Sequence, residues 1–389
     1  MDPTTGGVAA SLRNLLPVLD EMNILSEVVC FDAPVPLSET QDNGFVLHRI
    51  GPATGFWGRL SGFSHWLDLN TDNFDVIILH GLWLYNGYAY TKWIRRRRLQ
   101  HGIRLPRSWV MPHGMLDPWF QQSSGRRFKS VRNFMYWSLI ERNTIASADL
   151  LVFTSEAERE KAAQTFPGYK PSKTAVFQLG VPDPLDIISS VSHQQPDDGI
   201  DKKGFLLALG RIDPKKGFDL LPEVWRRLSL DPHYRDRLPR LLIAGPGWET
   251  AYGRKIKEDI AALALDNHIS TVGMLEGVAK WHALRTCSAL VMPSHQENFG
   301  LVAVEALACG TAVLISEKVD ISPVIIKYEA GISDSDNEAG IEKMVRTWLD
   351  MSLEERQKMK VNARNLFLDQ FEIRKTANRF KQLLEEKVI

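Results

Sequence analysis

Short apolar runs alternate with amphipathic stretches along most of the chain, a pattern typical of βαβ units built on parallel sheets. A first series of expected strands runs from Val28–Phe31 to Thr174–Gln178, and a second runs from Phe205–Leu209 to Ala312–Ile315. With 389 residues, the chain is also too long for one ordinary hydrophobic core. The sequence therefore predicts an α/β protein with two doubly wound, Rossmann-like domains.

The expected domain boundaries follow from the break between the two series. Residues 184–203 are polar and contain proline and serine, which is typical of a linker. We expect a first domain over residues 1–183, a second over residues 204–370, and a charged amphipathic helix over residues 371–389.

The start of the chain does not fit this pattern fully. It opens MDPTTGGVAASLRNLL, in which a turn at Gly6 and Gly7 leads into a helix. An apolar strand should precede such a turn, and none does. Because a first strand is central in this topology, its absence would leave the neighbouring strands unpaired. We expect either that the true start lies upstream or that the first unit is not Rossmann-like.

Composition narrows the class of protein. Lys+Arg and Asp+Glu are both 47, whereas a nucleic-acid-binding protein would usually show a basic excess. The three cysteines are scattered and have no metal-ligand spacing. No apolar run reaches the ~18 residues of a membrane span. These features indicate a cytoplasmic protein that binds no nucleic acid.

The segment PSHQENFGLVAVEALACG, residues 293–310, carries the strongest candidate site. It follows an expected buried strand, and ligands in open α/β sheets bind beyond the carboxyl ends of strands. Backbone N–H groups at the start of a helix near Gly300 would face a phosphate or a sugar. Glu297 in the loop would reach sugar hydroxyls, and Glu305 in the helix would accept hydrogen bonds from a ribose diol.

A second candidate site lies in LGRIDPKKG, residues 209–217. Arg211 and Lys216 occupy a strand-to-helix turn, where two cations can hold a diphosphate. Cations fixed there would stabilise the charge that builds on a leaving diphosphate without a metal ion. Alone, this segment is equally consistent with an ordinary surface turn.

With these motifs the sequence resembles the family-four (group 1) retaining glycosyltransferases, which have the GT-B fold of two Rossmann-like domains facing across a cleft. Glu297 and Glu305 match the E-(seven residues)-E motif, and Arg211 and Lys216 match R-x-x-x-x-K. The resemblance implies further donor contacts at Gly6, Gly7, Gly245, Gly247, Met274, Phe299, Gly300 and Leu301.

The same resemblance implies a function. The protein would be a metal-independent hexosyltransferase with no cofactor, and its donor would be a nucleotide-diphosphate sugar. The acceptor would be a glycan or a lipid-linked glycan in surface polysaccharide, exopolysaccharide or lipopolysaccharide biosynthesis. The second domain would bind the donor and the first the acceptor, and the last helix would return to the first domain.

His113, in MPHGMLDPW, matches the active-site histidine of that family and would contact the donor sugar. A lone histidine at a strand end is more often structural, so this role depends on the resemblance. Other residues at strand ends of the first domain would line the acceptor side: His80, Trp83, Asp117 and Trp119.

Residues 93–137 are rich in arginine and aromatic side chains, including the run Arg95–Arg98. A solvated helix face over core aromatics would explain this composition. A peripheral contact with an anionic membrane, where a lipid-linked acceptor would lie, would explain it too.

Two other functions remain open. A GT-B sugar-nucleotide epimerase would need acid and base groups in the first domain, where Asp117 is the one obvious candidate. A non-catalytic nucleotide-sugar-binding partner would not need the full set of charged motif residues. A metal-dependent transferase is disfavoured because the one D-x-D match, Asp334 and Asp336, lies in a polar stretch expected to be a loop.

Overall fold

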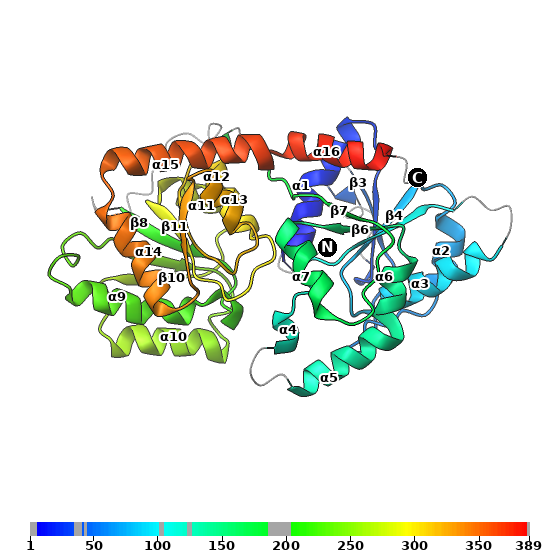
Figure 1. Cartoon of the computed structure of the whole chain (residues 1–389), viewed down its shortest axis with the longest axis horizontal. Coiled ribbons are helices and arrows are strands. Elements are labelled where there is room, and N and C mark those ends of the chain that lie inside the picture. The colour runs from blue at the N-terminus through cyan, green and yellow to red at the C-terminus, as the bar shows by residue number, and fades with distance from the viewer. Residues whose placement is uncertain are drawn as a thin grey trace. The chain divides into compact units, whose positions relative to one another are not determined.

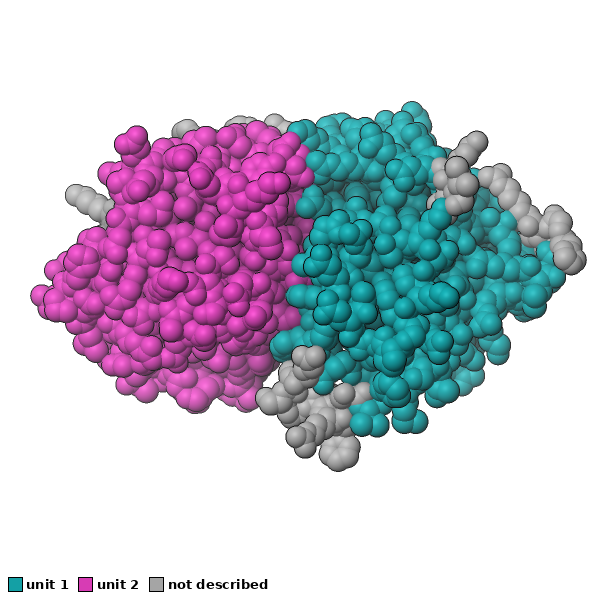
Figure 2. Space-filling view, viewed as in Figure 1, with its two compact units in different colours: residues 1–180, 373–389 teal, residues 181–372 magenta. Residues whose placement is uncertain are grey.

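The computed structural model describes residues 6–34, 41–42, 45–100, 105–122, 127–185 and 204–386. The chain divides into two compact units (Figure 2). Unit 1 comprises Met1–Gly180 and Ile373–Ile389, and unit 2 comprises Val181–Glu372. These divisions lie near the expected boundaries at 183 and 370, whereas most of the expected linker falls outside the described residues.

Unit 1 contains two separate sheets. The first has the order β1-β3-β2, and the second, which is parallel, has the order β4-β5-β6-β7. Their bounds are β1 Glu27–Cys30, β2 Gln41–Asp42, β3 Phe45–Arg49, β4 Val76–His80, β5 Arg107–Met111, β6 Leu150–Phe153 and β7 Thr174–Val176. Among the described residues β1 and β4 are edge strands and are mostly half-exposed, whereas β6 is buried throughout.

The helices of unit 1 are α1 Gly7–Glu21, α2 Phe63–Asn70, α3 Tyr85–Arg98, α4 Trp119–Gln122, α5 Arg127–Tyr136, α6 Arg142–Ser147, α7 Glu156–Thr165 and α16 Ile373–Glu385 (Figure 1). The π-helical turn Trp137–Glu141 separates α5 from α6.

The C-terminal helix α16 belongs to unit 1 and packs against α1. Its Phe380 ring contacts Trp109 of β5 and Phe177, with ring centroids 6.1 Å and 4.9 Å apart. The last helix therefore completes the hydrophobic core of the unit that begins the chain.

Unit 2 is built on one parallel six-stranded sheet of order β10-β9-β8-β11-β12-β13. The strands are β8 Phe205–Leu209, β9 Arg240–Ala244, β10 Ile269–Val272, β11 Ala289–Met292, β12 Val313–Ser316 and β13 Gly331–Asp334. The helices are α9 Leu221–Leu230, α10 Ala251–Ala262, α11 Gly277–Thr286, α12 Leu301–Ala308, α13 Ser322–Lys327, α14 Glu338–Asp350 and α15 Leu353–Leu366. The loop expected at Asp334 is wrong, because Asp334 ends β13 and pairs with Ser316 of β12.

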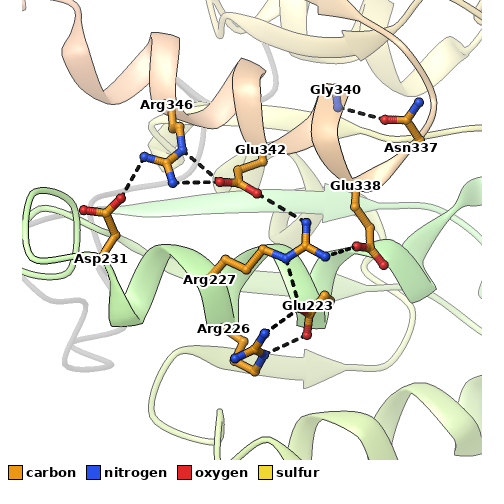
Figure 3. Close-up of polar contacts among 9 residues, drawn as sticks. All are labelled: Glu223, Arg226, Arg227, Asp231, Asn337, Glu338, Gly340, Glu342 and Arg346. Carbon is orange, nitrogen blue, oxygen red and sulfur yellow. Dashed lines mark hydrogen bonds and ion pairs between the residues drawn. The ribbon is translucent and has the colours of Figure 1, made fainter.

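A network of ion pairs joins α9 to α14 in unit 2 (Figure 3). Arg227 of α9 pairs with Glu338 and Glu342, and Arg346 of α14 pairs with Glu342 at 2.7 Å and with Asp231 at 2.9 Å. The arginine side chains are 39% and 32% exposed, so each pair contributes little by itself. Together the contacts fix how α14 lies against α9.

Candidate active site

The candidate site of unit 2 lies where the strand order of its sheet reverses. β8 and β11 are neighbours at the centre, and the chain continues outward from β8 to β9 and from β11 to β12. Such a switch point opens a crevice beyond the carboxyl ends of the two strands, where ligands of α/β proteins bind. The turn after β8 carries Arg211 and Lys216, and the loop after β11 carries Glu297. The structure thus brings the two sequence motifs to one place.

Lys216 and Glu297 form an ion pair between the turn after β8 and the loop after β11. Both side chains are largely buried, with 16% and 22% of their surface exposed. Burial would raise the pKa of Glu297, but the nearby charges of Lys216, Lys215 and Arg211 outweigh it and hold the pKa below its ordinary value. Glu297 is therefore an ionised carboxylate in a locally cationic site, which suits a group that contacts a sugar beside a diphosphate.

The N-terminus of α12 adds backbone donors to the same loop. Gly300 caps the helix with a φ of 75°, a left-handed conformation that favours glycine. The first N–H groups of a helix lack the carbonyl partners of its interior and form a natural anion-binding site; in α12 the Ala303 N–H donates to the Gly300 carbonyl at 2.8 Å. Phe299, in contrast, is 4% exposed and packs edge-on against Phe371, so its side chain belongs to the core. Leu301, the first residue of α12, is half-buried.

Glu305 lies in α12 with 12% of its side chain exposed. One of its oxygens receives Lys280 Nζ of α11 at 2.8 Å. Lys280 also lies 4.8 Å from the ring centroid of Trp281. This lysine, which was not singled out from the sequence, orients the Glu305 carboxylate through a hydrogen bond.

The loop that contains Gly245 and Gly247 packs against the turn that carries Arg211 and Lys216. A Cβ atom on Gly245 would lie 1.8 Å from the Gly210 carbonyl oxygen, so only glycine fits. The Ile212 N–H donates to the Pro246 carbonyl at 2.8 Å. These glycines therefore position the backbone around Arg211. Met274 follows the edge strand β10 and is 42% exposed.

His295 connects two loops of the site. Its backbone N–H donates to the Lys215 carbonyl at 2.8 Å, and its Nδ1 lies 2.9 Å from a carboxylate oxygen of Asp336. Asp336 follows β13, the strand that the sequence did not predict. The backbone bond therefore joins the loop of Glu297 to the turn of Lys216, and the side-chain contact joins the same loop to the residues after β13.

In unit 1 the structure brings His80 and His113 together at the ends of β4 and β5. His80 Nδ1 lies 2.9 Å from His113 Nε2, and the rings stack with centroids 5.2 Å apart. Burial lowers the pKa of His80 to about 4, and burial together with His80 lowers the pKa of His113 to about 3. Both rings are therefore neutral at pH 7, and one ring donates a hydrogen bond to the other.

Glu158 of α7 holds the turn that contains His113. Its carboxylate accepts the Gly114 N–H at 2.6 Å and the Thr154 N–H and hydroxyl at 2.7 Å and 2.8 Å. The residue is 3% exposed. His113 itself has a φ of 54°, which a residue other than glycine adopts only when its surroundings enforce it. Glu158 supplies that constraint by fixing the residue that follows.

A second buried glutamate holds the loop after β4. Glu141, in the π-helical turn, accepts the Trp83 N–H at 2.7 Å, and Trp83 has a φ of 70°. The Trp83 indole donates to the Met115 carbonyl at 3.2 Å. Burial raises the pKa of Glu141 to about 7. Trp83 is thus held beside the chain that follows His113.

Asp117 and Trp119 follow on that segment. One Asp117 oxygen accepts the Trp119 N–H at 2.8 Å and the other pairs with Lys161 at 3.2 Å. Asp117 is 7% exposed and its carboxylate accepts the N–H of the first residue of α4, so both of its oxygens have partners. Gly6 caps α1 with a φ of 116°, and Gly7 is the first residue of that helix.

Within the described ranges, no group of three or more His, Cys, Asp and Glu side chains could hold a metal ion. Among the helices of the same residues, none combines the length and the apolar composition needed to cross a bilayer.

Both halves of the chain match glycosyltransferase family models. Residues 6–180 match the "Glycosyl transferase 4-like domain", and residues 192–366 match "Glycosyl transferases group 1". The first of these regions lies within unit 1 and the second within unit 2.

Curated relatives match part of the chain. A D-inositol 3-phosphate glycosyltransferase from Frankia alni is 33% identical over 183 residues, which is 45% of this chain and 43% of the relative. One from Streptomyces bingchenggensis is 32% identical over 209 residues, 49% of this chain and 43% of the relative. Each match thus covers less than half of the relative's length.

Solved structures match nearly the whole chain. Sucrose-phosphate synthase from Thermosynechococcus elongatus superposes with a TM-score of 0.74 at 19% identity, covering 97% of this chain and 92% of that one. Anabaena Alr3699/HepE in complex with UDP gives 0.74 at 15% identity, with 99% and 97% covered. These are GT-B glycosyltransferases, so the similarity confirms the fold class. With both units matched by family models, the chain belongs to the group 1 glycosyltransferases, and its first unit is a glycosyltransferase 4-like domain.

Proposed function

We propose that the protein is a retaining, metal-independent hexosyltransferase that uses a nucleotide-diphosphate sugar. The main support is the meeting of Lys216 and Glu297 at the ends of β8 and β11, beside the N-terminus of α12. A diphosphate requires cations and amide donors, and a sugar requires a carboxylate acceptor; this crevice offers all three. The donor would bind unit 2, with Glu305 on the ribose diol.

The proposed chemistry needs no nucleophilic side chain. The bond between the anomeric carbon and the phosphate oxygen breaks, and its electron pair stays on the diphosphate. Arg211, Lys216 and the α12 amides would stabilise that charge. The acceptor oxygen attacks from the same face, and its proton passes to the leaving phosphate oxygen. Lys216 would turn from Glu297 to the diphosphate, which would free Glu297 for the sugar hydroxyls.

The acceptor would bind at unit 1. His80 offers a neutral ring nitrogen and Trp83 offers a ring face, which suit sugar hydroxyls and sugar rings, whereas His113 is the residue expected to contact the donor sugar. We propose a glycan or lipid-linked glycan acceptor in surface polysaccharide or lipopolysaccharide biosynthesis, at the cytoplasmic face of the membrane. WaaG, described as a glycosyltransferase involved in lipopolysaccharide biosynthesis, is similar in fold, with a TM-score of 0.66 at 16% identity over 98% of this chain and 97% of that one.

Donor binding and transfer test this proposal together. We expect one UDP-, GDP- or ADP-sugar to raise the melting temperature, because it binds only the folded protein. That donor, with an acceptor panel and EDTA, should yield a product of retained anomeric configuration. Inversion, or a requirement for added Mg²⁺ or Mn²⁺, would overturn the mechanism.

Two controls separate the alternatives. Turnover of the donor without acceptor to an epimeric sugar nucleotide would identify an epimerase. Donor binding that no acceptor converts to product would favour a non-catalytic binding partner.

A further inference from the structure

An apolar helix face lies exposed on unit 1. Val131, Phe134 and Met135 of α5 and Leu139 of the following π-helical turn are 61%, 48%, 57% and 70% exposed. Their spacing places them on one side of the helix. Figure 1 shows α5 at the lower edge of unit 1. We call these four residues the α5 apolar face.

The opposite side of the same helical segment is anchored in the core. Trp137 is 1% exposed and stacks on Phe166 with centroids 4.7 Å apart, and Glu141 is fully buried. The segment therefore cannot roll to bury its apolar face without dismantling this packing. Single exposed apolar residues are ordinary, but four on one helix face mark an interaction surface.

The charge of this segment indicates what the face binds. Between Pro118 and Ile140 the sequence contains Arg126, Arg127, Lys129 and Arg132 and no Asp or Glu. Arg132 is exposed, and the side chains of the other three lie outside the described set. Apolar side chains combined with an excess of basic ones suit an anionic lipid surface.

The arginine run at 95–98 offers less unpaired positive charge for binding lipid than its sequence suggests. Arg96, Arg97 and Arg98 each pair with an aspartate of unit 1, at 2.9, 2.9 and 2.8 Å. Trp93 and Trp109 of the same basic and aromatic stretch are 2% and 0% exposed. A solvated helix face over core aromatic side chains therefore explains that run. The exposed apolar side chains lie further along the chain, in α5 and the turn that follows it.

We propose that the α5 apolar face docks unit 1 on an anionic lipid bilayer. Phe134, Met135 and Leu139 would enter the boundary between headgroups and acyl chains, while basic residues contact lipid phosphates. This inference goes beyond the proposed transfer reaction, because lipid binding needs no donor and no turnover.

Co-sedimentation of the full chain with vesicles tests the proposal. We expect binding to phosphatidylcholine vesicles containing phosphatidylglycerol and at least tenfold weaker binding to pure phosphatidylcholine. Raising the salt concentration should weaken binding through screening. Phe134→Glu and Leu139→Glu should each reduce binding at least tenfold. Phe56→Glu is the matched control, because Phe56 is 98% exposed elsewhere on unit 1 and its loss should change nothing.

Each other outcome counts against the proposal. Equal binding to both vesicle types, or a wild-type level in both α5 variants, would overturn it. A concentration-dependent dimer that Leu139→Glu dissociates, with no vesicle binding, would assign the face to a second copy instead. Circular dichroism of each variant verifies that the fold is intact. Because transfer is measured separately on a water-soluble acceptor, failure of lipid binding leaves the transferase proposal untouched.

Discussion

The carboxylate of Glu158 accepts the backbone N–H of Gly114 at 2.6 Å, although the two residues lie on different βα units. Through this bond α7 holds the turn in which His113 adopts a left-handed conformation. Glu158 is thus a positioning residue: it acts on His113 through the backbone and does not face a substrate.

Glu158→Gln should therefore impair catalysis more than binding. An amide can replace only one of the two carboxylate oxygens, so Gly114 or Thr154 loses its acceptor. We expect kcat to fall about tenfold to a hundredfold, because small displacements at a reacting centre are costly. The donor KM should stay within about twofold, since the proposed donor site lies in unit 2. Glu156→Gln, on an exposed residue of the same helix, is the control. A fall in melting temperature with unchanged kcat would show that Glu158 is only structural.

Arg211→Ala and Lys216→Ala should each slow transfer by about 10²–10³-fold, the usual loss when one preorganised charge stabiliser is removed. The two variants should differ in thermal stability. Arg211 is exposed, so its removal should barely change the melting temperature. Removing Lys216 leaves Glu297 largely buried without its ion-pair partner, so that variant should melt earlier. Lys318→Ala, on a half-exposed lysine, is the control. Wild-type turnover in either motif variant would contradict the assignment.

The two glutamates should separate donor binding from chemistry. Glu305→Gln should mainly raise the donor KM, because it weakens a charge-assisted hydrogen bond worth about 1.5–3 kcal/mol. Glu297→Gln should lower kcat as well as kcat/KM, because its contact strengthens as the sugar becomes oxocarbenium-like. Steady-state kinetics distinguish the two, with the exposed Glu276→Gln as control. If both variants keep normal kinetics and only melt earlier, the motif is structural.

Glu141 should make stability depend on pH. Its pKa is raised from 4.5 to about 7 by burial, so the folded protein holds a proton that the unfolded chain releases above pH ~4.5. Its stabilising contribution is complete below that pH and falls as pH rises toward 7, by on the order of 3 kcal/mol. In Glu141→Gln the difference in urea midpoint between pH 4.5 and pH 8 should shrink. An unchanged difference would show that another group titrates there. Glu160→Gln on α7 is the control.

Much of unit 2 could be predicted because its local patterns agree with its fold. The apolar run Phe205–Leu209 became β8 with the expected bounds, and the expected strand Ala312–Ile315 became β12, shifted by one residue. The strand β13, with the sequence GISD, was missed because it is short and half polar. The meeting of Arg211, Lys216 and Glu297 follows from strand adjacency, which parallel topology makes predictable.

The side-chain contacts that position the site could not be predicted. Ser155 and Glu158 have the S-x-x-E spacing of a capping box, and the Ser155 hydroxyl does accept the Glu158 N–H. The carboxylate, however, goes to Gly114 and Thr154. The contact between Lys280 and Glu305 likewise joins separate helices. Helical or strand periodicity carries no information about partners so distant in sequence.

The passage of α16 back into unit 1 has a consequence for synthesis on the ribosome. Phe380 covers Trp109 and Phe177. The hydrophobic core of unit 1 therefore stays incomplete until all of unit 2 has been translated. Unit 2 is continuous in sequence and can fold as soon as it emerges. The outgoing and returning segments then meet where the Val181 N–H donates to the Phe371 carbonyl at 3.0 Å. The unit that is made first is therefore the one that matures last.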